Sequence, residues 1–185
     1  MKLSTQFLAL LAGAAAGSAT AIPTCQWRDW SCATDTTNAT RTFVESMFSA
    51  VALDNFGASF AEVLGEELSW TVTGSSPIAG VYEPKSVYIS QVLTPLRAVL
   101  ESLPVPIVEH IVVDGYWATV VWHSEGVKGK NGADYDMKYN WLMRTQPEGE
   151  DGELKVVEVI GFYDGQKVTN VFEGYDLAAL RNGTA

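Results

Sequence analysis

Residues 135–164 constrain the fold most strongly, because they contain two strand-like segments joined by a short acidic loop. The second segment, 154–163, is rich in valine, isoleucine and aromatic residues, as strands are. The eight residues between the segments include one proline and two glycines, which predicts a hairpin loop. Because strand side chains alternate, one face of the first segment carries large side chains: Met137, Tyr139, Trp141 and Met143. We interpret this face as the lining of a pocket, the alternative being ordinary core.

The N-terminus has the features of a secretory signal peptide ending at Ala21. Lys2 is positively charged, residues 7–16 are apolar, and the small residues at 19–21 resemble a cleavage site. The apolar run is too short to span a membrane, and no other run approaches that length. We therefore expect a secreted protein, or one of the secretory pathway, with no membrane partner. Removing 21 of the 185 residues leaves 164, enough for one domain with a core.

The mature chain is acidic, because loss of Lys2 leaves 11 basic residues against 22 acidic ones. This balance disfavours nucleic acid as a partner. An even number of cysteines in a secreted chain predicts a disulfide, here between Cys25 and Cys32. Asn38 and Asn182 each begin an N-glycosylation sequon.

The order of predicted elements indicates an α+β fold, with helices first and antiparallel strands last. Pro84 suits the start of a helix and Pro95 should kink it. The predicted helices are 36–53, 58–64 and 84–103. The predicted strands are 68–73, 107–113, 116–124 and 167–172, together with the two strand-like segments within 135–164. We divide the chain into the signal peptide 1–21, a disulfide-pinned arm 22–36, one domain 37–175 and a polar tail 176–185.

Several short motifs, taken in order, resemble a known family. They are the run from Trp70 through Gly74 and Pro77 to Tyr82, the run Tyr139-Asn-Trp141-Leu-Met-Arg144, and Phe162-Tyr-Asp164. Over about 37–172 the chain resembles SnoaL-like polyketide cyclases of the ketosteroid isomerase and nuclear transport factor 2-like superfamily. A signal peptide, sequons and small size would suit a secreted member from a filamentous fungus. The resemblance implies a cone-shaped α+β barrel: a strongly bent antiparallel sheet wrapped by three helices around a deep apolar pocket.

The chemistry implied by this resemblance is general acid–base catalysis. Ring closure or isomerisation needs a base beside a carbonyl and a donor for the enolate oxygen, and an apolar pocket raises the pKa of a carboxylate. Ketosteroid isomerase is a well-known enzyme in which the site raises the pKa of carboxyl groups. Asp164 stands where the cyclases carry their acid/base aspartate, with Tyr139 as candidate donor and His123 as a further acid–base candidate.

Each of these three residues also has a structural interpretation. Asp164 could cap the turn before Gly165, Tyr139 could be a core residue, and His123 could lie on the surface. The cyclases have a histidine partner on the strand before the aspartate, where this chain has Tyr139 and Trp141 instead. The His–Asp pair of the cyclases is therefore not present in matching form.

The expected pocket would suit a flat, hydrophobic polyketide or terpenoid. Its expected lining could equally be dry core: Trp70, Tyr82, Met137, Trp141 and Phe162. No cluster of residues has metal-ligand spacing, and no cofactor is implied.

Three functional hypotheses remain at this point. The first is a cofactor-free cyclase or isomerase acting on a hydrophobic secondary metabolite. The second is a binding protein for a small apolar ligand, which needs the cavity but not the carboxylate. The third is an interaction protein with a filled cone and an exposed apolar patch. A homodimer formed through the outer face of the sheet is a further expectation.

Overall fold

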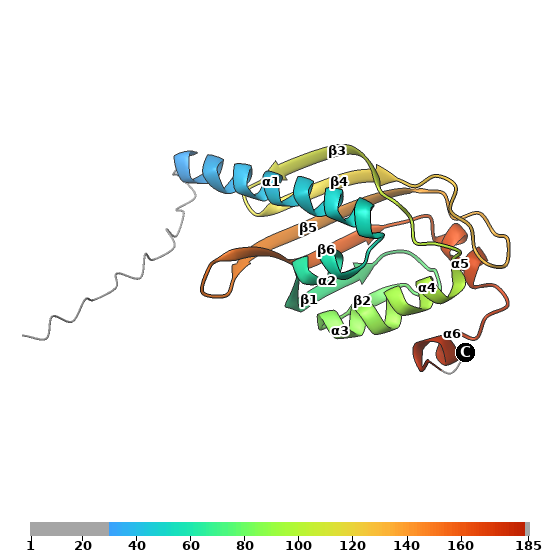
Figure 1. Ribbon diagram of the computed structural model, residues 1–185. Helices are drawn as coiled ribbons and strands as arrows, with labels where there is room; N and C mark the ends of the chain where they lie inside the picture. Colours follow the sequence, from blue (N-terminus) through green and yellow to red (C-terminus); the bar gives the residue numbers. More distant parts are fainter. Residues whose placement is uncertain (1–29, 184–185) are drawn as a thin grey trace, which may run out of the picture.

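The computed structural model describes residues 30–183, with side chains from residue 34 onward. A curved six-stranded sheet in the order β2-β1-β6-β5-β4-β3 forms the centre of the fold, and helices cover one of its faces (Figure 1). The strands are β1 (Leu64–Val72), β2 (Gly80–Tyr82), β3 (Ile107–Asp114), β4 (Trp117–His123), β5 (Lys138–Glu148) and β6 (Glu153–Phe162).

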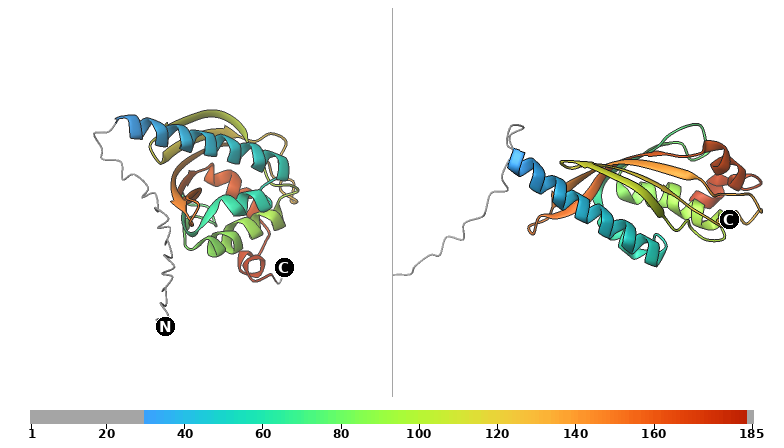
Figure 2. Two further views of the ribbon diagram at one scale, coloured as in Figure 1. Left: turned by 60° about the vertical axis from the view of Figure 1, so that its left-hand side comes forward. Right: turned by 90° about the horizontal axis from the view of Figure 1, so that it is seen from above.

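The sheet confirms the expected α+β class but is mixed rather than wholly antiparallel. Strand β1 runs parallel to its neighbour β6, with Trp70 beside Val159, while the other neighbouring pairs are antiparallel. A parallel pair needs a long crossover, and here the chain between β1 and β6 includes the helices and strands that build the rest of the sheet. The sheet curves without closing, so the expected barrel is an open cone (Figure 2).

Helix α1 (Trp30–Asp54) lies across β3 and β4. It packs through an apolar stripe at helical spacing, Val44, Met47, Phe48 and Val51. Thr37 accepts a hydrogen bond at 2.9 Å from the backbone N–H of Gly115 in the β3–β4 turn, which anchors the helix to the edge of the sheet. The helix begins at Trp30, so residues 30–36 of the expected arm are helical.

A second helical layer follows the short helix α2 (Ala58–Val63). It is a continuous run of α3 (Lys85–Tyr88), the π-helical segment η1 (Ile89–Leu93) and α4 (Thr94–Val99). The π-helical segment lies just before Pro95, where a kink was expected. Proline has no N–H to donate to the carbonyl four residues earlier, and Arg181 Nε donates to that carbonyl, Gln91 O, at 3.2 Å instead.

Two short helices follow the last strand of the sheet. Helix α5 (Gly165–Phe172) replaces the expected strand over 167–172, which was wrong. Val168, Val171 and Phe172 are buried at helical spacing, and Asp164 caps the helix. Helix α6 (Leu177–Arg181) lies in the expected polar tail and packs on α4, with Leu180 buried. The tail is therefore part of the fold as far as residue 183.

The inner face of the sheet and the helices enclose the core. On β4, Ala118, Val120 and Trp122 face inward, which leaves His123 on the outer face. Trp141 on β5 lies at the centre of an aromatic cluster, with ring centroids 5.0 to 6.1 Å from its neighbours, which are Phe48, Phe56, Phe60, Trp70 and Trp122.

Some expectations lie outside the described residues. The predicted signal peptide lies outside the described residues. The Cys25–Cys32 disulfide stays a prediction, because neither cysteine side chain is described. Asn38 and Asn182 are both exposed, whereas Thr40 of the first sequon is fully buried. Within residues 30–183 no helix combines the length and apolarity that a membrane span needs.

Candidate functional site

A small apolar cavity opens between the inner face of the sheet and the second helical layer. Measured as the space open to the centre of a water-sized sphere, its volume is about 40 Å³. One water needs roughly 10–15 Å³ by this measure, so the space suits a few waters or one compact molecule. Fifteen residues line it: Phe56, Val72, Ile78, Tyr88, Val92, Leu93, Leu96, Leu103, Pro104, Trp122, Tyr135, Tyr139, Trp141, Tyr163 and Val168.

The lining contains four tyrosines and two tryptophans but no charged side chain. Burial raises the pKa of Tyr88 and of Tyr135 well above the usual value. Burial likewise raises the pKa of Tyr139 and of Tyr163. All four hydroxyls are therefore protonated at neutral pH, and the cavity presents neutral hydrogen-bonding groups on an apolar wall.

One polar atom of the lining residues, Trp122 Nε1, has no hydrogen-bond partner in the described part of the chain. The Tyr139 hydroxyl lies within reach of Ser124 and Tyr135, and Trp141 lies within reach of the Tyr163 hydroxyl. The hydroxyl of Tyr163 accepts a hydrogen bond from Trp70 Nε1 at 3.2 Å. Buried polar groups are usually paired, so unpaired ones call for an explanation.

The helical wall of the cavity includes the π-helical segment. Val92 and Leu93 belong to η1, and Tyr88 directly precedes it. Tyr88 stacks on Trp70, with ring centroids 4.1 Å apart and planes 11° from parallel. Segments of π-helix often occur at functional sites, which adds weight to the cavity as the candidate site.

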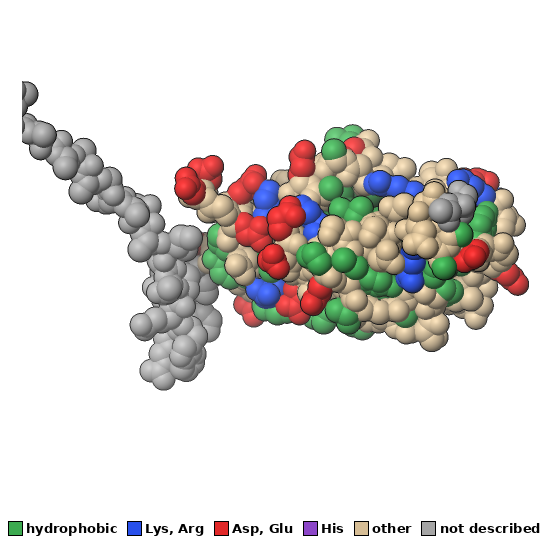
Figure 3. All heavy atoms as spheres, turned by 90° about the horizontal axis from the view of Figure 1, so that it is seen from below, with side chains coloured by type: hydrophobic (Ala, Val, Ile, Leu, Met, Phe, Trp, Pro, Cys, Tyr) green, Lys and Arg blue, Asp and Glu red, His purple; other side chains and the backbone are tan. Residues whose placement is uncertain are grey.

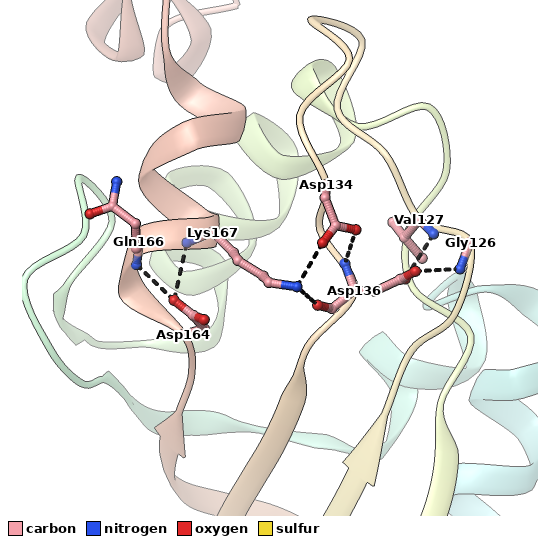
Figure 4. Close-up of polar contacts among 7 residues, drawn as sticks. All are labelled: Gly126, Val127, Asp134, Asp136, Asp164, Gln166 and Lys167. Carbon is pink, nitrogen blue, oxygen red and sulfur yellow. Dashed lines mark hydrogen bonds and ion pairs between the residues drawn. The ribbon is translucent and has the colours of Figure 1, made fainter.

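Asp164 does not line the cavity, where the base of the implied mechanism would have to lie. Its exposed carboxylate accepts hydrogen bonds from the backbone N–H groups of Gln166 and Lys167, at 3.0 and 3.2 Å (Figure 4). This is an N-cap of α5, the alternative interpretation of the same residue. The N-cap satisfies backbone donors that a helix leaves free at its start.

Lys167 links α5 to the loop that carries Tyr135. Its ammonium contacts Asp134 Oδ2 at 2.7 Å and the backbone carbonyl of Asp136 (Figure 4). The carboxylate of Asp136 in turn accepts hydrogen bonds from the backbone N–H groups of Gly126 and Val127. Tyr135 lies between the two aspartates, so this network holds a cavity-lining residue in place.

His123 lies outside the cavity, on the outer face of the sheet. Its Nδ1 is 2.8 Å from Glu109 Oε1 and its Nε2 is 3.3 Å from Glu125 Oε1. Lys138 also contacts Glu109, at 3.0 Å. This is an interaction among surface charges, and His123 has no route to a ligand in the cavity.

The remaining predicted lining residues divide between the cavity, the core and the surface. Tyr139 and Trp141 line the cavity, and Trp70 lies behind its wall. Tyr82 and Met137 are buried elsewhere, and the Tyr82 hydroxyl donates to Ile78 O at 2.8 Å. The expected inward position of Phe162 was wrong, since its side chain is 47% exposed.

Tyr163 takes the inward position that was expected of Phe162. The pairing of β5 with β6 shifts register between Arg144 and Thr145, so that Val157 forms a bulge and reverses the alternation beyond it. A bulge changes which face a side chain occupies. The sequence signal that could have revealed Tyr163 is Gly161, whose missing side chain leaves room for the ring of Tyr163.

A second, open groove lies at the opposite end of the molecule, near the β5–β6 hairpin. Figure 3 shows acidic side chains gathered at this end. Its two lysines are already paired, Lys85 with Glu66 and Lys155 with Glu153. Among the residues that the structure describes, no group of three His, Cys, Asp or Glu side chains could hold a metal ion. We interpret the groove as a solvated charged face.

No protein-family model matches the sequence, and no curated protein sequence matches it. Solved structures do match. An NTF2-like protein from Burkholderia thailandensis has a TM-score of 0.57 at 15% identity, over 73% of this chain and 97% of that chain. An NTF2-like protein of unknown function from Burkholderia pseudomallei has a TM-score of 0.58 at 13% identity, over 74% and 98%. The fold is NTF2-like.

A third solved structure, Bal32a from a soil-derived mobile gene cassette, is also similar to this chain. It has a TM-score of 0.53 at 15% identity, over 80% of this chain and 97% of that chain. Identities this low establish the fold alone. The expected nuclear transport factor 2-like fold is confirmed, and membership of the SnoaL-like family stays a prediction.

Proposed function

We propose that this protein binds a compact apolar small molecule in the cavity of its cone, and that binding rather than acid–base catalysis is its activity. The observation that carries the proposal is the lining: fifteen apolar or aromatic residues with no charged side chain among them. Small-molecule sites are concave and mostly apolar, with a few polar groups that orient the ligand. The signal-peptide features support a further part of the proposal, that the ligand is met in the secretory pathway or outside the cell.

The SnoaL-like cyclase or isomerase is the alternative for the same cavity. Neutral donors on its wall, such as Tyr139, would suit an enolate oxygen. Proton abstraction also needs a base within hydrogen-bond reach. The cavity lining has no Asp, Glu, His or Lys, and the two candidates Asp164 and His123 are occupied elsewhere. We therefore rank binding first.

The first test is the affinity of the mature protein for α-methylstyrene, an apolar single-ring probe, measured by titration calorimetry. We expect saturable binding that is lost in Leu96→Phe, because Leu96 lines the cavity and the larger ring would fill it. Leu53→Phe is the matched control, since Leu53 is 90% exposed. Circular dichroism verifies that both variants are folded. Absence of binding to the wild type, or equal binding by the Leu96 variant, would refute the proposal.

A second test separates binding from proton abstraction. Acetophenone has exchangeable protons beside its carbonyl, so a base in the cavity would accelerate deuterium uptake at its methyl group in D₂O. We expect the rate, followed by proton NMR, to equal that of buffer. An accelerated rate that disappears in Leu96→Phe would favour the cyclase or isomerase instead.

The outer face of the sheet supports a second candidate function, self-association. No described helix covers it, and one row across the six strands joins Val112, Thr119, Leu142, Ile160, Thr71 and Val81. Val112 is 62% exposed and Phe162, in the adjacent row, is 47% exposed. Unpartnered apolar patches often mark interaction sites. Light scattering of the wild type and of Val112→Ser tests it: a homodimer that dissociates in the variant would support this candidate, and a monomeric wild type would refute it.

A further inference from the structure

A second space lies beside the cavity, on the helical side of the molecule. It opens between α2 and the second helical layer, and its volume is about 250 Å³ by the same measure. Ala58 and Ala61 line its α2 side, and Ile89 and Arg97 line the opposite side. Ala58 and Arg97 are exposed, so this space, which we call the outer pocket, reaches the molecular surface.

Two side chains line both the cavity and the outer pocket, namely Phe56 and Leu93. They are 4% and 6% exposed. Because the same side chain borders each space, only its own thickness separates the two spaces at that point. Phe56 is the larger of the two side chains and is therefore the main part of this partition.

The aromatic neighbours of Phe56 also place it between the two spaces. Its ring centroid is 4.9 Å from that of Phe60, which lines the outer pocket but not the cavity. It is 6.0 Å from Trp141 and 6.2 Å from Trp122, which line the cavity but not the outer pocket. A molecule in the cavity therefore meets the ring of Phe56 before it can reach the outer pocket.

The backbone holds Phe56 in an unusual conformation. Asn55 and Phe56 have φ angles of 54° and 58°, in the left-handed region that bulky residues rarely adopt. Arg97 donates a hydrogen bond to the carbonyl of Phe56. The N–H of Gly57, the next residue, donates to the Asp54 carboxylate at 3.1 Å. Residues in such conformations persist only where their surroundings fix them, and they cluster at functional sites.

We propose that Phe56 sets the upper size limit of the ligand, by closing the cavity against the outer pocket. A protein interior is close-packed, so a ligand that needs more room must displace this ring, which lowers its affinity. The wild type is then selective for apolar molecules of about one ring. This inference rests on the proposed binding function and goes beyond it by naming the residue that determines ligand size.

Two probes that differ only in size test this limit on the mature protein. α-Methylstyrene carries one phenyl ring and a methyl group on its alkene, and 1,1-diphenylethylene carries a second phenyl ring in place of the methyl group. Tryptophan fluorescence follows binding, because Trp122 and Trp141 line the cavity. We expect the wild type to bind α-methylstyrene about 10-fold or more the tighter of the two, as overpacking by one ring would cause.

Variants of two neighbouring phenylalanines then test the partition. Phe56→Ala joins the cavity to the outer pocket, so the preference for the smaller probe should fall by about 10-fold or more, because the second phenyl ring can then be buried. Phe60→Ala is the matched control: it removes the same ring from the outer pocket alone and should keep the wild-type preference. Circular dichroism verifies folding. Phe56→Leu is the milder variant, and its preference should fall between those of the wild type and Phe56→Ala.

The outcomes separate size selection from binding itself. If the wild type binds the larger probe as tightly as the smaller one, or if both Phe56 variants keep the full preference, the size limit is refuted while apolar binding stands. If Phe60→Ala lowers the preference as much as Phe56→Ala, the cause is a general loosening of the aromatic core and the inference is wrong. If neither probe binds to the wild type, the proposed function fails along with the inference.

Discussion

Gly161 and Tyr163 are in direct contact at the end of β6, where the ring of Tyr163 folds back over the glycine. A Cβ atom at position 161 would lie 2.2 Å from the Tyr163 hydroxyl oxygen and 2.5 Å from Cζ. The same hydroxyl accepts the hydrogen bond from Trp70 Nε1. The absence of a side chain at one residue therefore determines the position of a cavity-lining ring two residues later.

The first prediction concerns this contact. Gly161→Ala should displace the Tyr163 ring and lower the free energy of unfolding by about 1–3 kcal/mol, as overpacking does. Urea unfolding followed by circular dichroism measures it. Gly165→Ala is the control, because its added Cβ would meet no atom closer than 3.8 Å. Equal stability of the two variants would contradict the contact.

The second prediction concerns Asp164, which we assign to helix capping. Asp164→Ala should lower the unfolding free energy by about 0.5–2 kcal/mol, whereas Asp164→Asn should nearly preserve it, since asparagine is an equally good N-cap. Binding of α-methylstyrene should be unchanged in the asparagine variant, because the carboxylate lies outside the cavity. A large loss of ligand affinity in Asp164→Asn would show that the residue acts in the site.

The third prediction concerns two buried tyrosines. The Tyr139 hydroxyl lies near Ser124 and Tyr135 but makes no well-formed hydrogen bond, so Tyr139→Phe should not lower the unfolding free energy. The Tyr82 hydroxyl donates to Ile78 O and accepts from Arg181. Tyr82→Phe should therefore lower the unfolding free energy by about 1 kcal/mol. Thermal and urea unfolding of both variants measure the contrast, and the same sign for both would contradict it.

The fourth prediction concerns alkaline pH. Burial raises the pKa of Tyr88, Tyr135, Tyr139 and Tyr163 above the usual 10.0. Because the unfolded chain loses these protons first, the stabilisation is present below pH 10 and is lost as pH rises toward the folded-state pKa values. The unfolding free energy should fall above pH 10 by about 1.4 kcal/mol per pH unit for each tyrosine. Tyr139→Phe should make the fall in unfolding free energy less steep, by about 1.4 kcal/mol per pH unit.

The fifth prediction concerns acid. A hydrogen bond from Lys167 holds the pKa of Asp134 below its usual value of 3.8. A lowered folded-state pKa stabilises the protein above pH 4, and this stabilisation is lost as pH falls through the folded-state value. Asp134→Asn should therefore be less stable than the wild type at pH 7 and equal to it near pH 2. A difference that persists at pH 2 would assign the effect to packing rather than charge.

Local patterns in the sequence were sufficient for much of the fold. The alternation in 137–143 placed Tyr139 and Trp141 inward. The helix predicted over 36–53 is present as part of α1, because side-chain periodicity depends only on local backbone geometry. The hairpin of β5 and β6 followed from its proline and glycines. The motifs over 37–172 indicated the NTF2-like superfamily whose fold the structure has.

Other parts of the site depend on contacts that no local pattern contains. The β4 segment alternates between Trp122 and His123, and only packing against α1 and the second helical layer decides that Trp122 is inside. Residues 167–172 had the β-branched composition of a strand. They form a helix because Asp164 caps it and Val168 packs over the cavity.

The sequence alone determined the α+β class, the inward aromatic face of β5 and the absence of a histidine where the cyclases carry one, since these follow from residue types and short-range spacing. Only the tertiary structure decided which aspartate, histidine and aromatic residues reach the cavity. A single bulge at Val157 exchanges Phe162 for Tyr163, and a helix N-terminus holds Asp164 outside. Both outcomes arise from pairing between segments, in which a shift of one residue reverses the face of every side chain that follows.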